Sequence, residues 1–154
     1  MYKEIIKLLD ANHVEYNIID HEPVYTSEQA AKIRGLSIDE GAKSLLLKSE
    51  KCFSLAVLSG SKKLDSKEYK LHIKAKDLRF ATPDEVKTVM KCEIGACYPF
   101  GNLIGLETIV DAGLLENEFI SFNPGQHDKS IRVKSSDYSR IVNPSISHIS
   151  KGES

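Results

Sequence analysis

The chain has 154 residues, of which 41% are hydrophobic and 28% charged, and its formal net charge at pH 7 is −1. This length and apolar content fit one hydrophobic core, so we expect a single domain over 1–154. No apolar run approaches the roughly 20 residues that cross a bilayer, and the first residues lack the features of a secretory signal. We therefore expect a cytoplasmic protein with no membrane partner.

The first part of the chain predicts a helix, a strand and a second helix. Apolar residues in 3–11 share one side of a helix, and 14–20 then alternates as a strand does. The segment from Thr26 to Gly35 begins with a capping-box pattern, in which Gln follows Thr after three residues, and it ends at a residue typical of helix stops. A helix is expected between these two positions.

The middle of the chain predicts a hairpin followed by two helices. The apolar runs 42–49 and 52–60 are separated by two residues, which indicates a hairpin of mostly buried strands. The segment 64–73 is expected to be helical. A second capping box, formed by Thr82 and the glutamate three residues later, opens a helix through about residue 90.

The last part of the chain predicts strands at 107–112, 118–123 and 130–135, then a short helix at 136–141. The tail 143–154 shows no periodicity and is expected to be mobile. Several links between strands are too short for parallel crossovers, which favours a mixed, largely antiparallel sheet with flanking helices. The predicted fold class is α+β or irregular α/β.

The residues that usually carry metals or nucleotides show no recognisable pattern. Cys52, Cys92 and Cys97 form no CxxC pair, and the five histidines are scattered, so we expect no disulfide framework, no metal site and no cofactor. Phosphate-binding loops and the GxSxG turn are absent from the sequence as well. Cys97 could act as a nucleophile with His127 as its base, although a buried structural cysteine is the simpler interpretation.

Charge is distributed unevenly along the chain. Residues 43–91 contain 12 lysines and arginines against 6 acidic residues, whereas the remainder contains 9 against 16. A basic segment of this kind is either a solvated surface or a face for nucleic-acid phosphates, and charge alone does not decide between them.

Lys43 is a candidate for a charged functional position. It follows a Gly-Ala pair and precedes the apolar strand residues 45–47. A lysine at the start of a buried strand lies at the rim of a sheet, where its ammonium can reach a phosphate or a developing negative charge. The alternative is an ordinary lysine at a strand end.

The segment 94-IGACYPFGN-102 gathers two glycines, a proline and two aromatic residues. Such a composition gives a rigid, shaped loop that can direct main-chain N–H groups at one oxygen atom. The other interpretation is a structural turn that places Tyr98 and Phe100 in the core. Local composition leaves both open.

The order of six segments along the chain resembles the YbaK/ProX family of aminoacyl-tRNA deacylases. These segments are 21-HEPVYTSEQAA-31, 42-AKSLLLK-48, 78-LRFATPDEV-86, 95-GACYPFG-101, the strand end Val110-Asp111 and 122-FNPGQHDKSIRV-133. The resemblance extends over about 15–141, and the same domain is similar to the editing insertion of bacterial prolyl-tRNA synthetase. It implies a YbaK-like fold.

The resemblance implies a stand-alone trans-editing enzyme that hydrolyses the ester of a mischarged aminoacyl-tRNA carrying a small amino acid. Its partners would be the acceptor end of the aminoacyl-tRNA and an aminoacyl-tRNA synthetase, with no role for DNA. An aminoacyl ester is already activated, so such an enzyme needs positioned water and charge stabilisation rather than a covalent nucleophile. The alternative is a non-catalytic module of the same fold that binds a tRNA end or a synthetase.

The resemblance also implies which residues form the site. It assigns the functional lysine to Lys43, which would anchor the terminal phosphate, and a GxxxP loop to Gly95–Pro99, whose main chain would hold the aminoacyl group while the ribose hydroxyl assists water. The implied lining positions are Tyr25, Ser44, Ala96, Tyr98, His127 and His21. Ser44 stands where alanine-specific relatives carry Asn, and 122-FNPG-125 where they carry Phe-His-Pro, which argues against alanine specificity.

Overall fold

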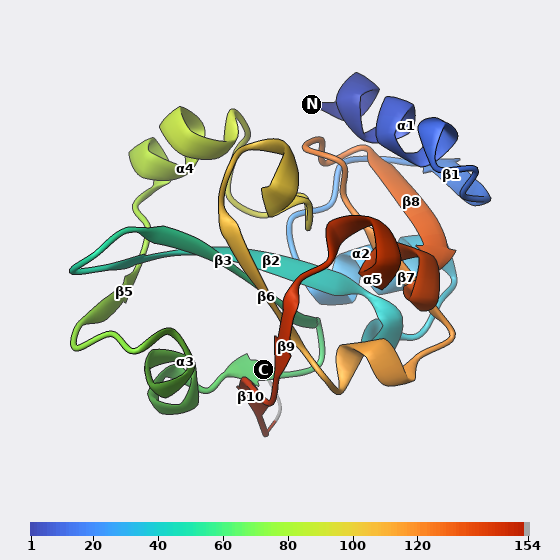
Figure 1. Cartoon of the computed structure of the whole chain (residues 1–154). Helices are drawn as coiled ribbons and strands as arrows, with labels where there is room; N and C mark the ends of the chain where they lie inside the picture. Colours follow the sequence, from blue (N-terminus) through green and yellow to red (C-terminus); the bar gives the residue numbers. More distant parts are fainter. Residues whose placement is uncertain (153–154) are drawn as a thin grey trace.

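The hairpin expected over 42–60 forms the centre of the fold. A computed structural model describes residues 1–152, and in it the hairpin belongs to a five-stranded sheet (Figure 1). In spatial order the strands are β5 (Leu78–Phe80), β2 (Ala42–Ser49), β3 (Phe53–Ser59), β6 (Glu107–Asp111) and β9 (Ser145–Ser147). β2 pairs antiparallel with β3 and β5, whereas β6 runs parallel to β3 and β9. The expected mixed sheet is confirmed.

The remaining strands form two smaller antiparallel sheets. β8 (Lys129–Lys134) lies between β1 (Tyr16–Asp20) and β7 (Phe119–Phe122), and β4 (Lys63–Leu64) pairs with β10 (Ser150–Lys151). Antiparallel pairing therefore predominates, as the sequence predicts. The prediction of the α+β class is confirmed, although the strands are divided among three sheets.

The helices begin and end close to the predicted positions. They are α1 (Tyr2–Ala11), α2 (Ser27–Arg34), α3 (Ser66–Ile73), α4 (Pro83–Met90) and α5 (Ser135–Val142). α4 has the full capping box: the Thr82 hydroxyl accepts from the Glu85 N–H, and the Glu85 carboxylate accepts from the Thr82 N–H. In α2 the Thr26 cap is present, but the Gln29 side chain accepts from the N–H of Tyr25. Among the described residues no helix is long and apolar enough to cross a membrane.

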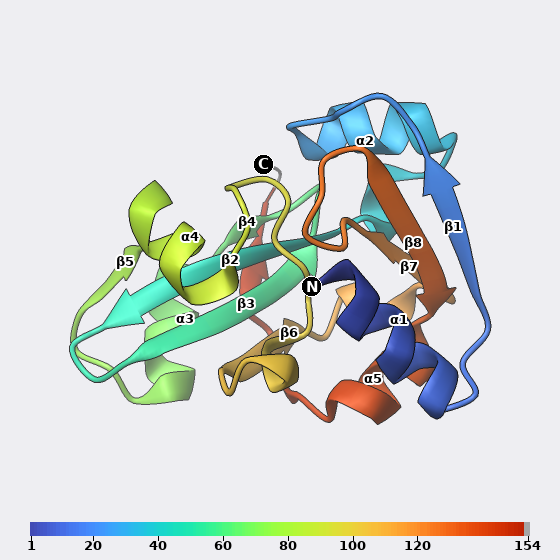
Figure 2. The ribbon, with the colours of Figure 1, turned by 90° about the horizontal axis from the view of Figure 1, so that it is seen from above.

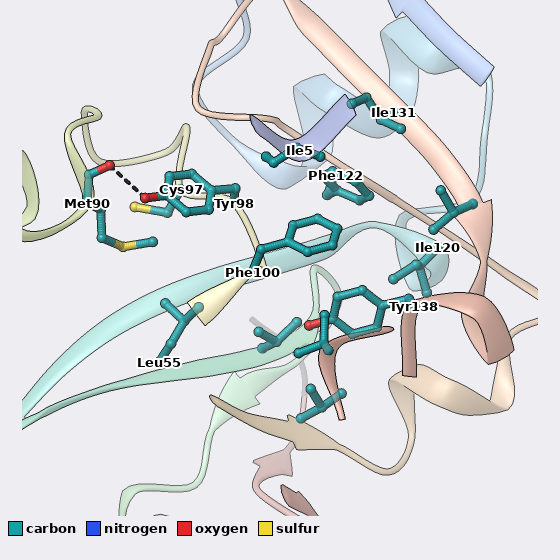
Figure 3. Close-up of a cluster of buried hydrophobic side chains, with 14 of the residues drawn as sticks. Ile5, Leu55, Met90, Cys97, Tyr98, Phe100, Ile120, Phe122, Ile131 and Tyr138 are labelled. Atoms are coloured by element: carbon teal, nitrogen blue, oxygen red, sulfur yellow. Dashed lines mark hydrogen bonds between the residues drawn. The ribbon is translucent and has the colours of Figure 1, made fainter. Parts of the chain in front are cut away.

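The larger hydrophobic cluster packs the long hairpin against the three-stranded sheet, with α1, α4 and α5 around it. Figure 3 shows its centre, where the Phe100 ring meets Phe122 and Tyr138 edge-on at centroid distances of 5.2 and 5.5 Å. Seen from above, α4 lies over the hairpin, and the loop that follows α4 passes between α4 and the segment that precedes β8 (Figure 2). This arrangement brings 94–102 next to the start of the hairpin.

The tail, which we expected to be mobile, instead adds an edge strand to the five-stranded sheet and packs Ile149 into a second cluster. Residues 145–147 and 150–151 form β9 and β10, and Ile149 is fully buried in this second cluster with Leu58 and Tyr69. Strands of two or three residues are too short to show an alternating pattern, which is why the sequence does not reveal them. The tail prediction also covered residues 153–154, which lie outside the described residues.

Candidate active site

A cleft of about 470 Å³ opens beside the first half of β2. Its lining residues come from the segments 25–34, 41–46, 80–86 and 94–97, together with Asn123. Pairing with β5 covers only residues 47–49 of β2, so the start of this strand has an open edge that faces the cleft. The volume is within the range of about 300–1,000 Å³ that is usual for small-molecule sites.

Ser44 lies at this open edge. The Ala81 N–H donates to the Leu46 carbonyl at 2.9 Å, which shows that even-numbered residues of β2 direct their main-chain groups to the edge shared with β5 and the cleft. Ser44 therefore directs its main-chain N–H toward the cleft. Its side chain is 9% exposed, and within residues 1–152 its hydroxyl has no hydrogen-bond partner. A buried hydroxyl without a hydrogen-bond partner costs folding free energy, unless a ligand forms the missing hydrogen bond.

Lys43 lines the same cleft and is half-buried. Its ammonium donates to the carbonyl of Lys62, and it forms no ion pair with any of the described residues. Burial lowers the pKa of Lys43 from its ordinary value, because the charged form loses hydration. The positive charge is thus available to an anionic ligand.

Gly95 forms a tight turn at the wall of the cleft. Its φ of +91° is a conformation that residues with a side chain rarely adopt, and a Cβ there would lie 3.3 Å from both the His127 ring and the Tyr25 carbonyl. The Gly95 carbonyl accepts from the Asn123 amide at 3.1 Å. The backbone angle therefore strongly favours glycine, and any side chain there would also press on His127 and Tyr25.

Arg34, the last residue of α2, also lines the cleft. Its guanidinium donates to the hydroxyls of Ser130 (2.6 Å) and Ser121 (3.1 Å) and to the amide oxygen of Asn123 (2.7 Å). Burial lowers the pKa of Arg34 to about 10. The group remains charged at neutral pH and ties α2 to the three-stranded sheet.

Of the residues after Gly95, Cys97 lines the cleft, whereas Ala96, Tyr98 and Pro99 do not. Tyr98 is fully buried, and its hydroxyl donates to the Met90 carbonyl at 2.8 Å (Figure 3). The Pro99 carbonyl accepts from the Tyr138 hydroxyl at 2.6 Å. Ala96 borders a neighbouring hollow instead. The expected lining position of Tyr98 therefore differs from its place in the core, because this large side chain fills space under the loop.

The two histidines named by the sequence lie outside the cleft. His127 borders the neighbouring hollow; its Nδ1 is 2.9 Å from the Val24 carbonyl, and its ring stacks at 4.5 Å on Tyr25, which does line the cleft. His21 is hydrogen-bonded to Ser130 at 2.7 Å, behind Arg34. Both rings therefore support residues that face the cleft.

Cys97 lines the cleft, but its surroundings do not favour a nucleophile. The neighbouring Cys92 thiol, 3.7 Å away, and burial raise the pKa of the Cys97 thiol. His127 interacts with Val24 and Tyr25 rather than with this thiol. A neutral thiol is a poor nucleophile.

Among the described residues no group of three or more His, Cys, Asp or Glu is placed to hold a metal ion.

Several cleft residues are absent from the sequence-based prediction. Arg34 reads as an ordinary cation at a helix C-terminus, and Asn123 as part of a turn. Phe80 and Ile94, exposed apolar side chains at the cleft, were not predicted either, whereas Tyr25 was predicted as a lining residue and lies there. The position of Arg34 directly before a helix-ending glycine gives no signal of burial, because burial depends on the second sheet.

The chain is thus an α+β protein with a small-molecule cleft that carries two cations and an unpaired hydroxyl. Residues 21–141 match the family model described as "Aminoacyl-tRNA editing domain". The chain belongs to this family, and the resemblance predicted from the sequence is confirmed.

Relatives that cover nearly the whole chain share the class of activity. The Multifunctional Ser/Thr-tRNA deacylase ProXp-y of Escherichia coli (strain K12) is 31% identical over 150 residues, which cover 94% of this chain and 90% of that protein. The Prolyl-tRNA editing protein ProX of Acetoanaerobium sticklandii is 29% identical over 144 residues, covering 90% and 88%. These names agree with the predicted deacylase class.

Solved structures agree on the fold. A hypothetical protein, APE2540, superimposes with a TM-score of 0.88 at 18% identity, covering 96% of this chain and 99% of that one. A candidate trans-editing enzyme for prolyl tRNA synthetase gives a TM-score of 0.86 at 22% identity, covering 98% and 97%. At these identities the likeness concerns the fold alone.

Proposed function

We propose that this protein hydrolyses the ester that joins a wrongly attached small amino acid to the 3′ end of a tRNA, and that it acts in trans on free aminoacyl-tRNA in the cytoplasm. The observation that carries the proposal is the cleft, in which Lys43, the unpaired Ser44 hydroxyl and the Gly95 turn face one volume. Family membership and the names of the relatives support the same reaction class.

The reaction needs no covalent nucleophile from the protein. An aminoacyl ester is activated, and attack by water places negative charge on its carbonyl oxygen, where fixed N–H donors stabilise it. The main-chain N–H of Ser44 points toward the cleft edge and is one such donor, and Gly95 and Cys97 form another part of the cleft wall. The hydroxyl of the terminal ribose assists the water, and the neutral thiol of Cys97 takes no part.

Lys43 binds the phosphate of the terminal nucleotide. Its ammonium lies at the start of β2, is half-buried and, among residues 1–152, has a neutral carbonyl as its only partner. A phosphate replaces this weak interaction with a charge-assisted one, which holds the ester in register with the cleft. The role is therefore one of positioning the substrate at the reacting centre.

Ser44 determines which amino acid the cleft accepts. Its unpaired hydroxyl can bond to a hydroxyl on the substrate, and a site built to bond to a substrate hydroxyl disfavours an analogue that lacks it. We therefore assign serine and threonine esters as the preferred substrates. The Ser/Thr-tRNA deacylase relative in Escherichia coli carries a name consistent with this choice.

The α4 side of the basic segment 43–91 faces the tRNA, since α3 packs on the other face of the five-stranded sheet. Lys87 on α4 and Lys91, which directly follows this helix, border the hollow next to the cleft. Contacts of this kind bind the acceptor stem weakly and depend on salt. A synthetase is a second partner: a proline–tRNA ligase of Pseudothermotoga lettingae is 32% identical over 95 residues, covering 61% of this chain and 16% of that enzyme.

The test is a deacylation panel in which purified protein is incubated with alanyl, seryl, threonyl and cysteinyl esters of several tRNAs. We expect release of serine or threonine to exceed the uncatalysed rate by at least tenfold on one or more tRNAs. If the protein binds tRNA but releases no amino acid from any ester, the proposal is wrong and the chain is a binding module.

A further inference from the structure

Arg34 is a partly buried cation that forms no ion pair among residues 1–152, although the charge of Glu40 acts on it from nearby. All three of its hydrogen bonds go to neutral oxygens. The nearby carboxylate of Glu40 is bound by Arg132 at 2.8 Å. Burying an unneutralised charge costs free energy, so this arrangement weakens the fold unless the charge has another use.

The charge of Arg34 determines how the Asn123 amide is turned. A guanidinium can only donate hydrogen bonds, so the amide oxygen of Asn123 must face Arg34. The amide nitrogen then points the other way, and it donates to the Gly95 carbonyl at 3.1 Å. If the Asn123 amide were reversed, its N–H groups would face the Arg34 guanidinium and its oxygen would face the Gly95 carbonyl oxygen.

The Asn123 contact fixes a peptide plane in the cleft wall. The carbonyl of the Gly95–Ala96 peptide accepts from Asn123, and the N–H of the same peptide donates to the Glu93 carbonyl at 3.1 Å. A peptide bonded at both ends cannot rotate freely, and Gly95 is the residue of the loop with the most backbone freedom. The two hydrogen bonds of the Gly95–Ala96 peptide therefore restrict backbone rotation in the wall of the cleft.

Arg34 itself is held rigidly. Its Nε donates to Ser130, so the Ser130 hydroxyl hydrogen is free to bond to His21 at 2.7 Å, and the other His21 nitrogen donates to the Glu22 carbonyl at 2.7 Å. A second serine bonds to another nitrogen of the guanidinium. A planar fork bonded on several sides keeps one orientation.

We propose that Arg34 is a positioning residue for deacylation, which acts through Asn123 to fix the Gly95–Ala96 peptide in the wall of the cleft. The proposal rests on the proposed function, since the peptide is assigned there to hold the aminoacyl group. It extends that function by naming the residues that keep the wall in its working shape. Arg34 needs no contact with the substrate in this role.

Asn123→Asp separates positioning from stability. The aspartate keeps the shape of the side chain and gives Arg34 a carboxylate partner, so the melting temperature should equal or exceed that of the wild type. It removes the donor to the Gly95 carbonyl and places an oxygen there. We expect kcat/KM for seryl-tRNA or threonyl-tRNA to fall about 10- to 100-fold, since small misplacements at a site have effects of this size.

Asn117→Asp is the matched control. The Asn117 amide donates to the carbonyls of Asp39 (3.2 Å) and Leu114 (3.0 Å) and does not line the cleft. The same chemical change there should lower the melting temperature and leave kcat/KM within twofold of the wild type. Equal losses of kcat/KM in both variants would mean a general effect of the new charge and would overturn the inference.

Amide exchange gives a readout that does not depend on activity. In Asn123→Asp the Ala96 N–H should exchange with solvent at least tenfold faster, whereas Asn117→Asp should leave it unchanged. Full kcat/KM in Asn123→Asp, with an active wild type, would overturn the inference and leave the deacylase function intact. A wild type that is inactive on every ester would instead remove the proposed function.

Arg34→Lys tests the cation directly. Lysine keeps the charge but cannot bond to both serines and to Asn123 at once, so it should retain an intermediate kcat/KM between wild type and Arg34→Met. Relative to the wild type, both Arg34 variants should change kcat more than KM, because the cleft wall is displaced while the phosphate contact of Lys43 remains. Equal kcat in wild type and Arg34→Met would contradict the positioning role.

Discussion

Two regions of the molecule, the surroundings of Asp111 and the cleft, contain buried polar groups. They differ in whether the protein itself completes the hydrogen bonds of these groups. Asp111 is 3% exposed, and its carboxylate accepts from the Ile149 N–H (2.8 Å), the Ser150 N–H (3.1 Å) and the Ser150 hydroxyl (2.8 Å). In the cleft, the Ser44 hydroxyl has no partner among residues 1–152 and the Lys43 ammonium bonds only to a neutral carbonyl.

The difference separates a structural group from a functional one. A buried charge whose bonds are complete within the protein holds elements together, and Asp111 does this by joining β6 to the C-terminal strand. A buried group left incomplete costs folding free energy, and such groups persist where a ligand completes them. Asp111 should therefore control stability and the cleft groups activity.

Lys43→Met should produce the largest effect on activity. We expect kcat/KM for the preferred ester to fall at least about 100-fold, because the phosphate loses a charge-assisted bond in a partly buried site. Burial lowers the pKa of Lys43 below its unfolded value, so its protonated form at neutral pH opposes folding. The melting temperature should therefore stay the same or rise. Unchanged kcat/KM would remove Lys43 from the site.

Asp111→Ala should have the opposite result. It leaves the N–H groups of Ile149 and Ser150 buried without their acceptor, which should lower the free energy of unfolding by about 2 kcal/mol. For a domain of this size the melting temperature should drop by about 4 to 8 °C. Calorimetry measures the loss, and kcat/KM at 20 °C should remain within twofold. A large loss of activity in the folded variant would contradict the separation.

Local signals predict most of the elements of this fold. The capping box at Thr82, the helix stop at Gly35 and the two apolar runs of the hairpin act within a few residues, and the structure has the corresponding elements. β9 and β10 were not predicted, because residues 143–151 gain order from distant partners such as Asp111. Long-range pairing leaves no periodic trace in segments this short.

The candidate site could be predicted only in part for the same reason. Lys43 and Gly95 stand beside local features, namely a strand start and a glycine-containing loop, that mark them in the sequence, whereas Ser44 was named only through the family resemblance. Arg34 is bonded to side chains of the three-stranded sheet, and Tyr98 lies in the core, so the places of both depend on packing that a sequence pattern does not specify. Placement of these residues required the tertiary structure.

Ser44→Ala should have the smallest effect and the most specific one. Because the hydroxyl has no partner within the described residues 1–152, its removal leaves none of them unsatisfied, and the melting temperature should not fall. Hydroxyl-bearing esters lose one hydrogen bond in the cleft while an alanyl ester loses none, so the ratio of kcat/KM for seryl over alanyl esters should drop about tenfold. The measurement is a competition between the two esters on one tRNA. An equal loss of kcat/KM for both esters would assign Ser44 to general packing. A change in the ratio places the amino-acid side chain of the substrate next to the Ser44 hydroxyl. The cleft, unlike the Asp111 region, is then a site whose hydrogen bonds are completed by its substrate.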